Sequence, residues 1–382
     1  MTCVDRRIIP KDMPKDMPRD LNETQQKSTD LLKALYAEAV HAALPAAILP
    51  AHLPPRPKGR LVIIAIGKAA ASMAAAAEAH YDQTGLEGIA LTRHGHAQPT
   101  KLIEVVEAGH PVPDAAGVAA SARIMDLATT LGADDPARLI TLAISDVAGD
   151  DPAVIASGPT VPDATTKADA LALLSRWKVP VPQVLAEAIA RAPESARAGE
   201  ACFNSADYKL IASGSGSLDA AAKHAAAHGY EVLNLGDRIE GEARDVAKTH
   251  AQLALAAKAK GQRLAILSGG EVAVTFASPL NGRGGPNQEY ALALAIALNG
   301  ATGIAALAGD TDGIDGGSGA ADDPAGAMIF SDTLARAASL ILDPQVALDQ
   351  HDSGRFFSRL GDLLKTGPSF TNVNDFRVIL VG

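Results

Sequence analysis

Two loops of the chain combine glycine with charged or amide side chains in patterns suited to a cation and to phosphate. The run Gly309–Gly319 carries Asp310, Asp312 and Asp315. Carboxylates this dense repel one another unless a cation compensates them, and Mg²⁺ prefers such hard oxygen ligands together with substrate phosphates. The spacing is not that of a twelve-residue EF-hand loop. A magnesium site is therefore predicted here, with an exposed acidic turn as the alternative.

The second loop reads NGRGGPNQE from residue 281. Gly284 and Gly285 let backbone N–H groups approach a ligand, and Arg283 can bind an oxyanion through two hydrogen bonds. Asn287 and Gln288 add amide donors at the start of a predicted helix. This combination favours a phosphate site over a flexible hairpin.

Lys68 and Asp146 each follow a predicted buried strand. Lys68 stands between the apolar run 61–66 and an alanine-rich helix. An ammonium group beside a helix N-terminus can clamp a phosphate or a carboxylate, and a solvated lysine at a turn is the alternative. Asp146 follows LITLAIS and can serve as a base or a metal ligand. No GxxxxGK[ST] motif occurs, so the lysine loop is not a Walker A loop.

Two further glycine turns follow predicted strands. The turn that begins SGSGSLD at Ser213 resembles a dinucleotide turn without its third glycine, so a tight turn or a phosphate contact is expected rather than a specific NAD site. The turn SGGE at Ser268 has the same position after a strand. The candidate nucleotide- and phosphate-binding residues are Gly67, Ser213, Gly214, Gly216, Ser268, Gly269, Gly270, Gly284, Gly285, Asn287 and Gln288.

These loops are positioned by alternating strands and helices. Apolar runs predict strands at 61–66, 88–93, 103–107, 139–145, 208–212, 231–235, 264–267, 303–308 and 376–381, and helical spacing is found over 30–48, 115–131 and 289–299. Alternation of this kind predicts an α/β fold with mostly parallel sheets, whose ligands gather at the carboxyl ends of the strands. A chain of 382 residues favours two domains, predicted at 30–260 and 261–382. The polar residues 1–29 are predicted to be a disordered leader.

Composition excludes several function classes. The chain has a net charge of −10 and only 3% aromatic residues, which argues against nucleic-acid binding. Its two cysteines fit a reducing compartment, and neither a signal peptide nor an apolar stretch of transmembrane length is found. A cytoplasmic enzyme without a membrane partner is expected. The sequence does not fix the oligomeric state, and a homodimer is one compatible assembly.

Seven stretches of the chain, taken together, resemble the glycerate 2-kinase family that carries a MOFRL domain. They cover most of the sequence after residue 60. They are AIGKAA (65–70), GHPVPD (109–114), SDVAGDDPAVIASGPTVPD (145–163), LSGGEVAVT (267–275), GRGGPNQE (282–289), AGDTDGIDG (308–316) and TGPSFTNVNDFRVILV (366–381).

The resemblance implies ATP-dependent phosphorylation of D-glycerate at its 2-hydroxyl, with Mg²⁺, giving 2-phosphoglycerate. It also implies a Rossmann-like N-terminal domain with a mostly parallel sheet, a smaller α/β MOFRL domain, and an active site in the cleft. Lys68 matches the functional lysine of the family. Pro286 stands where many relatives have a functional arginine, so Arg283 is the substitute candidate. The catalytic set is Lys68, Arg283 and Asp146, and the metal set is Asp310, Asp312 and Asp315.

One departure from the family lies near residue 135, where ADD runs directly into PARLITLAISD. Relatives carry several dozen more residues here, including a strand that ends in a glycine-rich loop. The chain is therefore either an internally shortened kinase or a protein with altered catalysis. Two alternatives stay open: an NAD(P)H-dependent hydroxypyruvate reductase, and a catalytically impaired protein that binds a sugar acid or a nucleotide.

Overall fold

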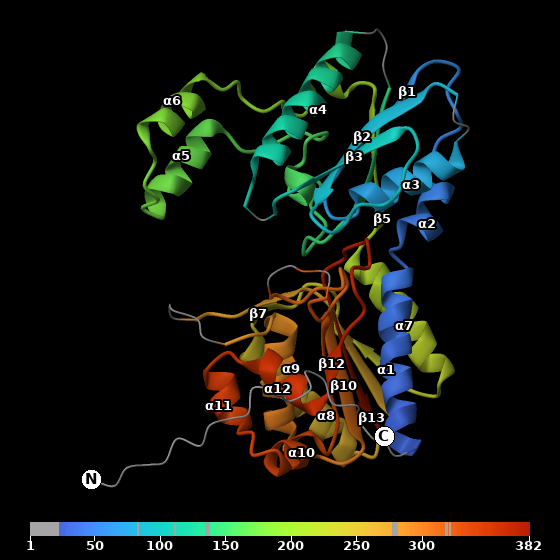
Figure 1. Cartoon of the computed structure of the whole chain (residues 1–382), viewed down its shortest axis with the longest axis vertical. Helices are drawn as coiled ribbons and strands as arrows, with labels where there is room; N and C mark the ends of the chain where they lie inside the picture. The colour runs from blue at the N-terminus through green and yellow to red at the C-terminus, as the bar shows by residue number, and fades with distance from the viewer. Residues whose placement is uncertain are drawn as a thin grey trace. The chain divides into compact units, whose positions relative to one another are not determined.

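The structure, a computed structural model, describes residues 23–81, 84–110, 112–133, 138–276, 282–317, 320 and 322–382. It has a mixed α/β fold that includes parallel sheets (Figure 1). Two compact units are distinguished. Unit 1 consists of the described residues within Met1–Ala39, Leu218–Ser369 and Asp375–Gly382, and unit 2 of those within Val40–Ser217 and Phe370–Asn374.

The units do not follow the boundary predicted at residue 261. Strand β6 (Glu231–Asn234) pairs in parallel with β8 (Leu264–Ser268), and helix α8 (Ala243–Ala259) packs on α9 (Pro286–Leu298). These contacts join residues 218–260 to the later part of the chain. Helix α1 (Glu23–His41) begins inside the predicted leader, whose residues 1–22 lie outside the described part.

Unit 1 contains a six-stranded sheet in the order β12-β11-β10-β13-β8-β6. Its other strands are β10 (Ile304–Asp310), β11 (Gly326–Ile329), β12 (Leu363–Leu364) and β13 (Asp375–Val381). Strand β13 lies antiparallel between β10 and β8, and β11 is antiparallel to both its neighbours. The expectation of mostly parallel pairing is wrong for this sheet. Parallel neighbours need a long crossover, whereas β10 and β11 are joined by a loop in which the described residues form no helix.

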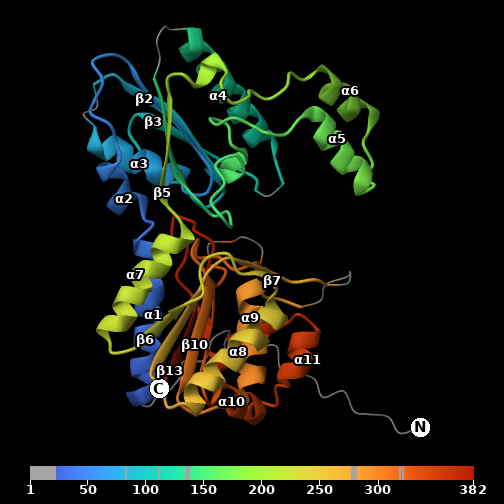
Figure 2. The same cartoon turned by 180° about the vertical axis from the view of Figure 1, so that it is seen from behind.

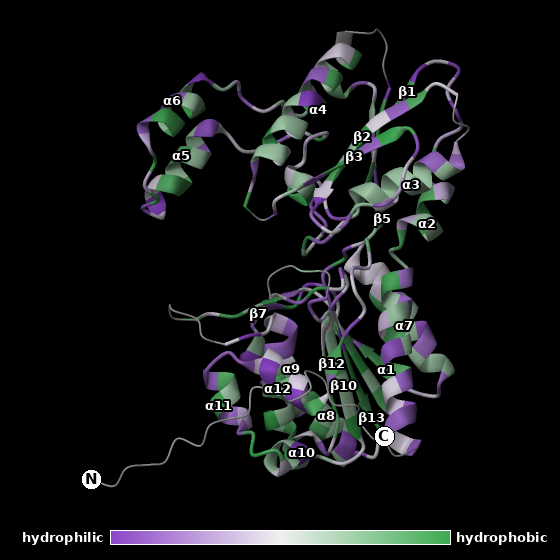
Figure 3. Ribbon diagram, viewed as in Figure 1, coloured by the Kyte–Doolittle hydropathy of each residue, from purple (hydrophilic) through white to green (hydrophobic). Residues whose placement is uncertain are grey.

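Helices cover both faces of this sheet. One face carries α1 and α7 (Gly214–Ala227), and the other carries α8, α9, α10 (Thr333–Ser339), α11 (Pro344–Asp349) and α12 (Ser353–Leu360) (Figures 1 and 2). Every residue of β13 and β8 is buried. Figure 3 shows the strands around β13 as mostly apolar. A short parallel pair, β7 (Glu240–Glu242) with β9 (Glu271–Ala273), completes the unit.

Unit 2 contains two parallel sheets, as predicted for the N-terminal part. Strands β1 (Leu61–Ile66), β2 (Leu86–Arg93) and β3 (Ile103–Ala108) form one sheet with β2 in the middle. Strands β4 (Leu139–Ile144) and β5 (Ala206–Ala212) form the other. Helix α3 (Ala70–His80) packs on β1 and β2, and α4 (Ala115–Ala133) packs on β3.

Several short elements of unit 2 were not predicted. They are η2 (Ile155–Ser157), α5 (Lys167–Arg176), α6 (Gln183–Arg191) and η3 (Ala201–Phe203). Helices α5 and α6 bury no residue, although both carry apolar side chains (Figure 3). Trp177, directly after α5, is 71% exposed.

The predicted helix over 30–48 is two helices. Helix α1 ends at His41, and α2 (Pro45–Ile48) begins at a proline, which has no N–H to continue the first helix and suits the first position of the next. The one-turn helix η1 (Leu49–Ala51) follows. Within the described residues no single helix has both the length and the apolar character to cross a membrane. Helix α1 and Pro45–Ala51 meet these criteria only when joined across a 58° bend.

Strands β1 and β4 are less buried than their sequences predict. LVIIAI and LITLAI are continuous apolar runs, typical of parallel strands covered on both faces. Nevertheless Ile66 is 48% exposed and Leu139 is 44% exposed. Each strand has a neighbour on one side only among the described residues, β2 for β1 and β5 for β4. Unit 2 therefore exposes apolar strand surface that such a sheet ordinarily covers.

Candidate functional site at the strand ends

Unit 2 brings together two of the predicted catalytic residues. Lys68 follows β1, and Asp146 follows β4. The Lys68 Nζ atom lies 3.8 Å from Asp146 Oδ2, with 25% of the lysine side chain and 41% of the aspartate side chain exposed. Gly67, between β1 and Lys68, has a φ of 112°, which a residue with a Cβ adopts only with strain. The turn thus places an ammonium group beside a carboxylate at an accessible strand end.

The C-terminal segment supplies two residues that the sequence analysis did not select. Asn372 Nδ2 donates to Asp146 Oδ2 over 2.8 Å, and Asn374 Nδ2 donates to the Asp146 backbone oxygen over 2.8 Å. The stretch TNVND was part of the family resemblance, but no spacing rule connects it with residue 146. The cluster is therefore Lys68, Asp146, Asn372 and Asn374.

In unit 1, Asp315 joins the two predicted ligand loops. Its Oδ1 accepts from the backbone N and Nδ2 of Asn287, and its Oδ2 accepts from the backbone N and Nε2 of Gln288, over 2.8–3.3 Å. Asp315 therefore caps the N-terminus of α9. Burial, together with the charge of Asp375, raises the pKa of its carboxyl to about 7, although the hydrogen bonds from the Asn287 backbone and from the Gln288 backbone and side chain lower it.

This geometry shows the partners of three predicted site residues. Asp315 was predicted to bind metal, but both of its oxygens accept two N–H groups each. Asn287 and Gln288 were predicted to donate amides to phosphate, but their backbone and side-chain N–H groups point to Asp315 and, for Asn287 Nδ2, also to Asp375. All three residues are at most 2% exposed. Their observed role is to hold the loops in place.

Replacing Asp315 by asparagine is expected to lower the free energy of unfolding by about 2–4 kcal/mol, because an NH₂ group then faces two N–H donors that lose their acceptor. Denaturant unfolding measures the loss. The exposed Asp322, in the same loop region, provides the matched control Asp322→Asn, which should change stability by less than about 0.5 kcal/mol. Equal unfolding midpoints for the two variants would contradict the capping role.

A buried ion pair lies beside the predicted phosphate turn at residues 268–270. Arg377 Nη1 lies 3.0 Å from Asp375 Oδ2, and both side chains are at most 5% exposed. Arg377 also donates to Ser268 Oγ and to the Gly269 backbone oxygen. A Cβ on Gly270 would lie 2.3 Å from the Ile239 oxygen, so the turn is closely packed. The arginine, which the sequence analysis did not select, thus fixes the predicted phosphate turn at residues 268–270.

The two remaining aspartates of the acidic loop make local turns. Asp310 Oδ1 accepts from Asp312 N over 2.9 Å, and Asp312 Oδ1 accepts from Ile314 N over 2.8 Å. Tyr36 donates to the Asp310 backbone oxygen, and burial together with the Asp310 charge raises the pKa of this phenol. Within the described part of the chain, no three carboxylate, histidine or cysteine side chains form a metal-binding group. Asp310 is half-buried and Asp312 is buried, so Asp310 is the better placed of the two to meet a cation.

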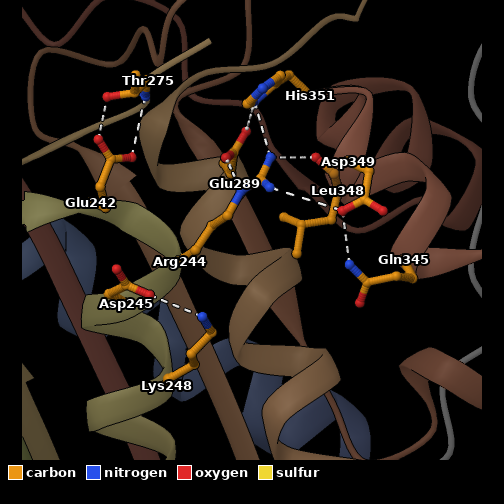
Figure 4. A network of polar contacts seen from close by, with 10 residues as sticks. All are labelled: Glu242, Arg244, Asp245, Lys248, Thr275, Glu289, Gln345, Leu348, Asp349 and His351. Carbon is orange, nitrogen blue, oxygen red and sulfur yellow. Dashed lines mark hydrogen bonds and ion pairs between the residues drawn. The ribbon is translucent and has the colours of Figure 1, made fainter.

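A second polar network holds Glu289, in the first turn of α9, through Arg244 and His351 (Figure 4). The buried Glu289 accepts from Arg244 Nε over 2.6 Å and contacts His351 Nδ1 at 2.9 Å. Arg244 also donates to the Leu348 backbone oxygen. Helix α8, helix α9 and the end of α11 are thereby tied together, and the position of the loop before α9 is set.

The loop before α9 is positioned through its backbone. Arg283 N donates to Asp352 Oδ1 over 3.0 Å, and the Arg283 oxygen accepts from Gly354 N. A Cβ on Gly285 would lie 2.2 Å from the Asp315 oxygen, so only glycine fits there. Pro286 is the first residue of α9, a position that suits proline. The Arg283 side chain is exposed and takes part in no ion pair among the described residues.

The turn at Ser213 leads from β5 into α7, which begins at Gly214. Nothing lies within 4 Å of a Cβ built on Gly216, so this glycine is not required by close packing. The turn is an N-terminal helix turn, as expected from its sequence, and its contact with phosphate stays a prediction.

Two family patterns and several known proteins match this chain. The MOFRL family pattern matches residues 264–375, and a domain of unknown function, DUF4147, matches residues 31–136 and 133–190. A Pyrococcus horikoshii protein named glycerate 2-kinase is 30% identical over 85% of this chain and 88% of that protein. The chain belongs to the glycerate 2-kinase family with a MOFRL domain.

Other proteins similar to this chain carry different names. The crystal structure of a Thermotoga maritima glycerate kinase superposes with a TM-score of 0.78 at 27% identity, covering 94% of this chain and 100% of that one. Two Agrobacterium vitis proteins that are 39% and 40% identical, over 94% and 100% of their own lengths, are named as hydroxypyruvate reductases.

The alignment to one relative is longer than the part of this chain that it covers. The alignment to the 39% identical protein spans 419 positions, whereas 92% of this chain is about 351 residues. About 68 positions therefore stand opposite gaps in this chain. The DUF4147 match is split into two pieces that meet at residues 133–136, between α4 and β4.

Proposed function

We propose that this chain transfers the γ-phosphoryl group of ATP to the 2-hydroxyl of D-glycerate and forms 2-phosphoglycerate. The observation that carries the proposal is the pair Lys68 and Asp146, an ammonium group 3.8 Å from a carboxylate at an accessible strand end. The kinases among the relatives supply the reaction class.

In the proposed mechanism, Asp146 accepts the proton of the 2-hydroxyl as that oxygen attacks the γ-phosphorus. The bond from this phosphorus to the β-γ bridging oxygen breaks, ADP leaves, and the proton is later released from Asp146 to solvent. Lys68 compensates negative charge on the phosphoryl group or binds the glycerate carboxylate. Phosphoryl transfer depends mainly on positioning and charge compensation, which suits a site of this composition.

Arg283 and the acidic loop have proposed roles that rest on the resemblance. Arg283 would bind phosphate or carboxylate through its exposed guanidinium group. Mg²⁺ is usually held by one or two carboxylates together with substrate phosphates, and Asp310, with Asp312 beside it, fits one such ligand. Asp315 does not fit, because its oxygens are occupied by N–H donors. The cleft position of the site, the Rossmann-like character, the cytoplasmic location and a homodimer stay predictions.

A coupled assay tests the proposal. ATP, Mg²⁺ and D-glycerate are supplied, and enolase reports 2-phosphoglycerate as it forms. Product that depends on both ATP and D-glycerate is expected.

A second candidate, NAD(P)H-dependent reduction of hydroxypyruvate, is favoured by the names of the two Agrobacterium vitis relatives. The incomplete glycine motif at Ser213 argues against it. Consumption of NADH on addition of hydroxypyruvate, without ATP, would favour the reductase. Ligand-induced thermal stabilisation without either reaction would favour a binding protein.

Family members are expected to carry a segment between α4 and β4 that this chain lacks. Its absence bears on how active the chain is. We infer that residues which the family carries there, and which this chain lacks, would cover apolar surface of unit 2. The half-exposed strands β1 and β4 and the exposed helices α5 and α6 support this inference. Reduced stability and reduced turnover, relative to longer members of the family, are the expected consequences.

A further inference from the structure

Residues 370–374 belong to unit 2, although the residues on both sides of them belong to unit 1. The buried Thr371 donates through Oγ1 to the Ala43 backbone oxygen over 2.7 Å. The Phe370 ring meets the buried His96 ring edge-on, with 6.0 Å between centroids. The segment is thus fixed to unit 2 independently of its contact with Asp146.

The orientation of the Asn372 amide is set by its neighbour. Asn374 N donates to Asn372 Oδ1 over 3.0 Å, so the Nδ2 group must point the other way, where it donates to Asp146 Oδ2. Asn374 has a φ of 72°, a conformation that asparagine tolerates better than most residues. Its side chain holds the Asp146 backbone oxygen. Both the carboxylate and the main chain of Asp146 are therefore held by this segment.

The two oxygens of Asp146 have different surroundings. Oδ2 accepts from Asn372 and lies near Lys68, whereas Oδ1 has no hydrogen-bond partner among the described residues. The Asp146 side chain is 41% exposed, but Asn372 is only 6% exposed. A ligand can thus reach Asp146, while Asn372 acts on it from the protein side.

We propose that Asn372 is a positioning residue, which holds Asp146 through Oδ2 so that Oδ1 is presented to the proton of the acceptor hydroxyl. The inference rests on the proposed function, because it assigns the base of that reaction. Lys68 is the charged group near the same oxygen, with its Nζ atom 3.8 Å from Asp146 Oδ2.

Two substitutions probe this role in opposite ways. Asn372→Ala removes a hydrogen bond to a charged group, and we expect kcat to fall about 10- to 100-fold with little change in KM for ATP. Asn372→Asp places a second carboxylate at the Asp146 oxygen, and like charges at this distance raise the pKa of one partner. The acidic limb of the kcat/KM profile should then move to higher pH by at least about one unit.

The experiment combines kinetics with a measurement that needs no turnover. The Asp146 carboxyl carbon is followed by ¹³C NMR against pH in the full chain and in both variants, with Asp146→Asn to assign the signal. The exposed Asn204 gives the control Asn204→Ala, which should leave kinetics and titration unchanged. An upward shift of the Asp146 titration in Asn372→Asp, by at least about one pH unit, is the expected result.

The two proposals fail in different ways. If the full chain forms no 2-phosphoglycerate but the Asp146 titration moves as expected, the reaction is misassigned and the positioning contact stands. If the titration is the same in both variants as in the full chain, Asn372 does not hold Asp146 and this inference is overturned. A lower melting temperature with an unmoved titration overturns it equally, because that is what a purely structural role produces.

Discussion

Replacing Lys68 by alanine is expected to lower kcat/KM for phosphorylation of glycerate by about 10²–10³-fold, the usual effect of deleting one group that stabilises transition-state charge. Lys68 Nζ is the ammonium beside Asp146, and its side chain is only partly exposed. The substitution also leaves Asp146 without its neighbouring cation. Initial rates with ATP and D-glycerate measure the loss, and calorimetric titration with ATP gives a second readout.

Two controls separate charge from folding in this experiment. Lys58→Ala removes an exposed lysine before β1 and should leave kcat/KM unchanged. Lys68→Arg keeps a cation but changes its shape and reach, so an intermediate rate is expected. Thermal unfolding should be similar for all forms. Wild-type turnover by both Lys68→Ala and Arg283→Ala would remove these residues from the mechanism.

Inserting the corresponding segment of the 40% identical Agrobacterium vitis protein between α4 and β4 is expected to stabilise unit 2 and to increase turnover. Complete burial of a large apolar side chain stabilises by about 1.5–3 kcal/mol. Val118 and Met125 on α4, Leu139 on β4 and Ile66 on β1 are all more than 40% exposed. We therefore expect a gain of several kcal/mol and a rise in Tm on the order of 10 °C.

The matched control is a glycine-serine linker of equal length at the same position. It lengthens the connection without covering apolar surface, so its Tm should not rise. Calorimetry, together with binding of an apolar dye, measures the difference between the two insertions. The same Tm and dye binding for both would contradict the idea that the segment completes the core of unit 2.

The sequence predicted the parts of the site that depend on local pattern. Lys68 and Asp146 were selected because each follows an apolar strand. The two side chains lie 3.8 Å apart, although β1 and β4 belong to different sheets. The helix start after the GRGG loop and most strands were also placed within a few residues.

Contacts between distant residues could not be predicted in this way. Asn372 is 226 residues away from Asp146 in the sequence, and its segment belongs to unit 2 although the residues on both sides of it belong to unit 1. Asp315 was grouped with Asp310 and Asp312 by density of charge. Its true partners are the N–H groups of α9, and nothing in the spacing distinguishes a helix cap from a metal ligand.

The enolase-coupled assay tests the central claim most directly, because enolase accepts 2-phosphoglycerate and thus reports the reaction and its position together. The full chain is incubated with D-glycerate and Mg²⁺, with and without ATP, beside Lys68→Ala. We predict product only when ATP is present, with a large loss in the variant. Absence of product in the full chain and in the form with the inserted segment, together with NADH consumption on hydroxypyruvate, would contradict the assignment as a glycerate 2-kinase.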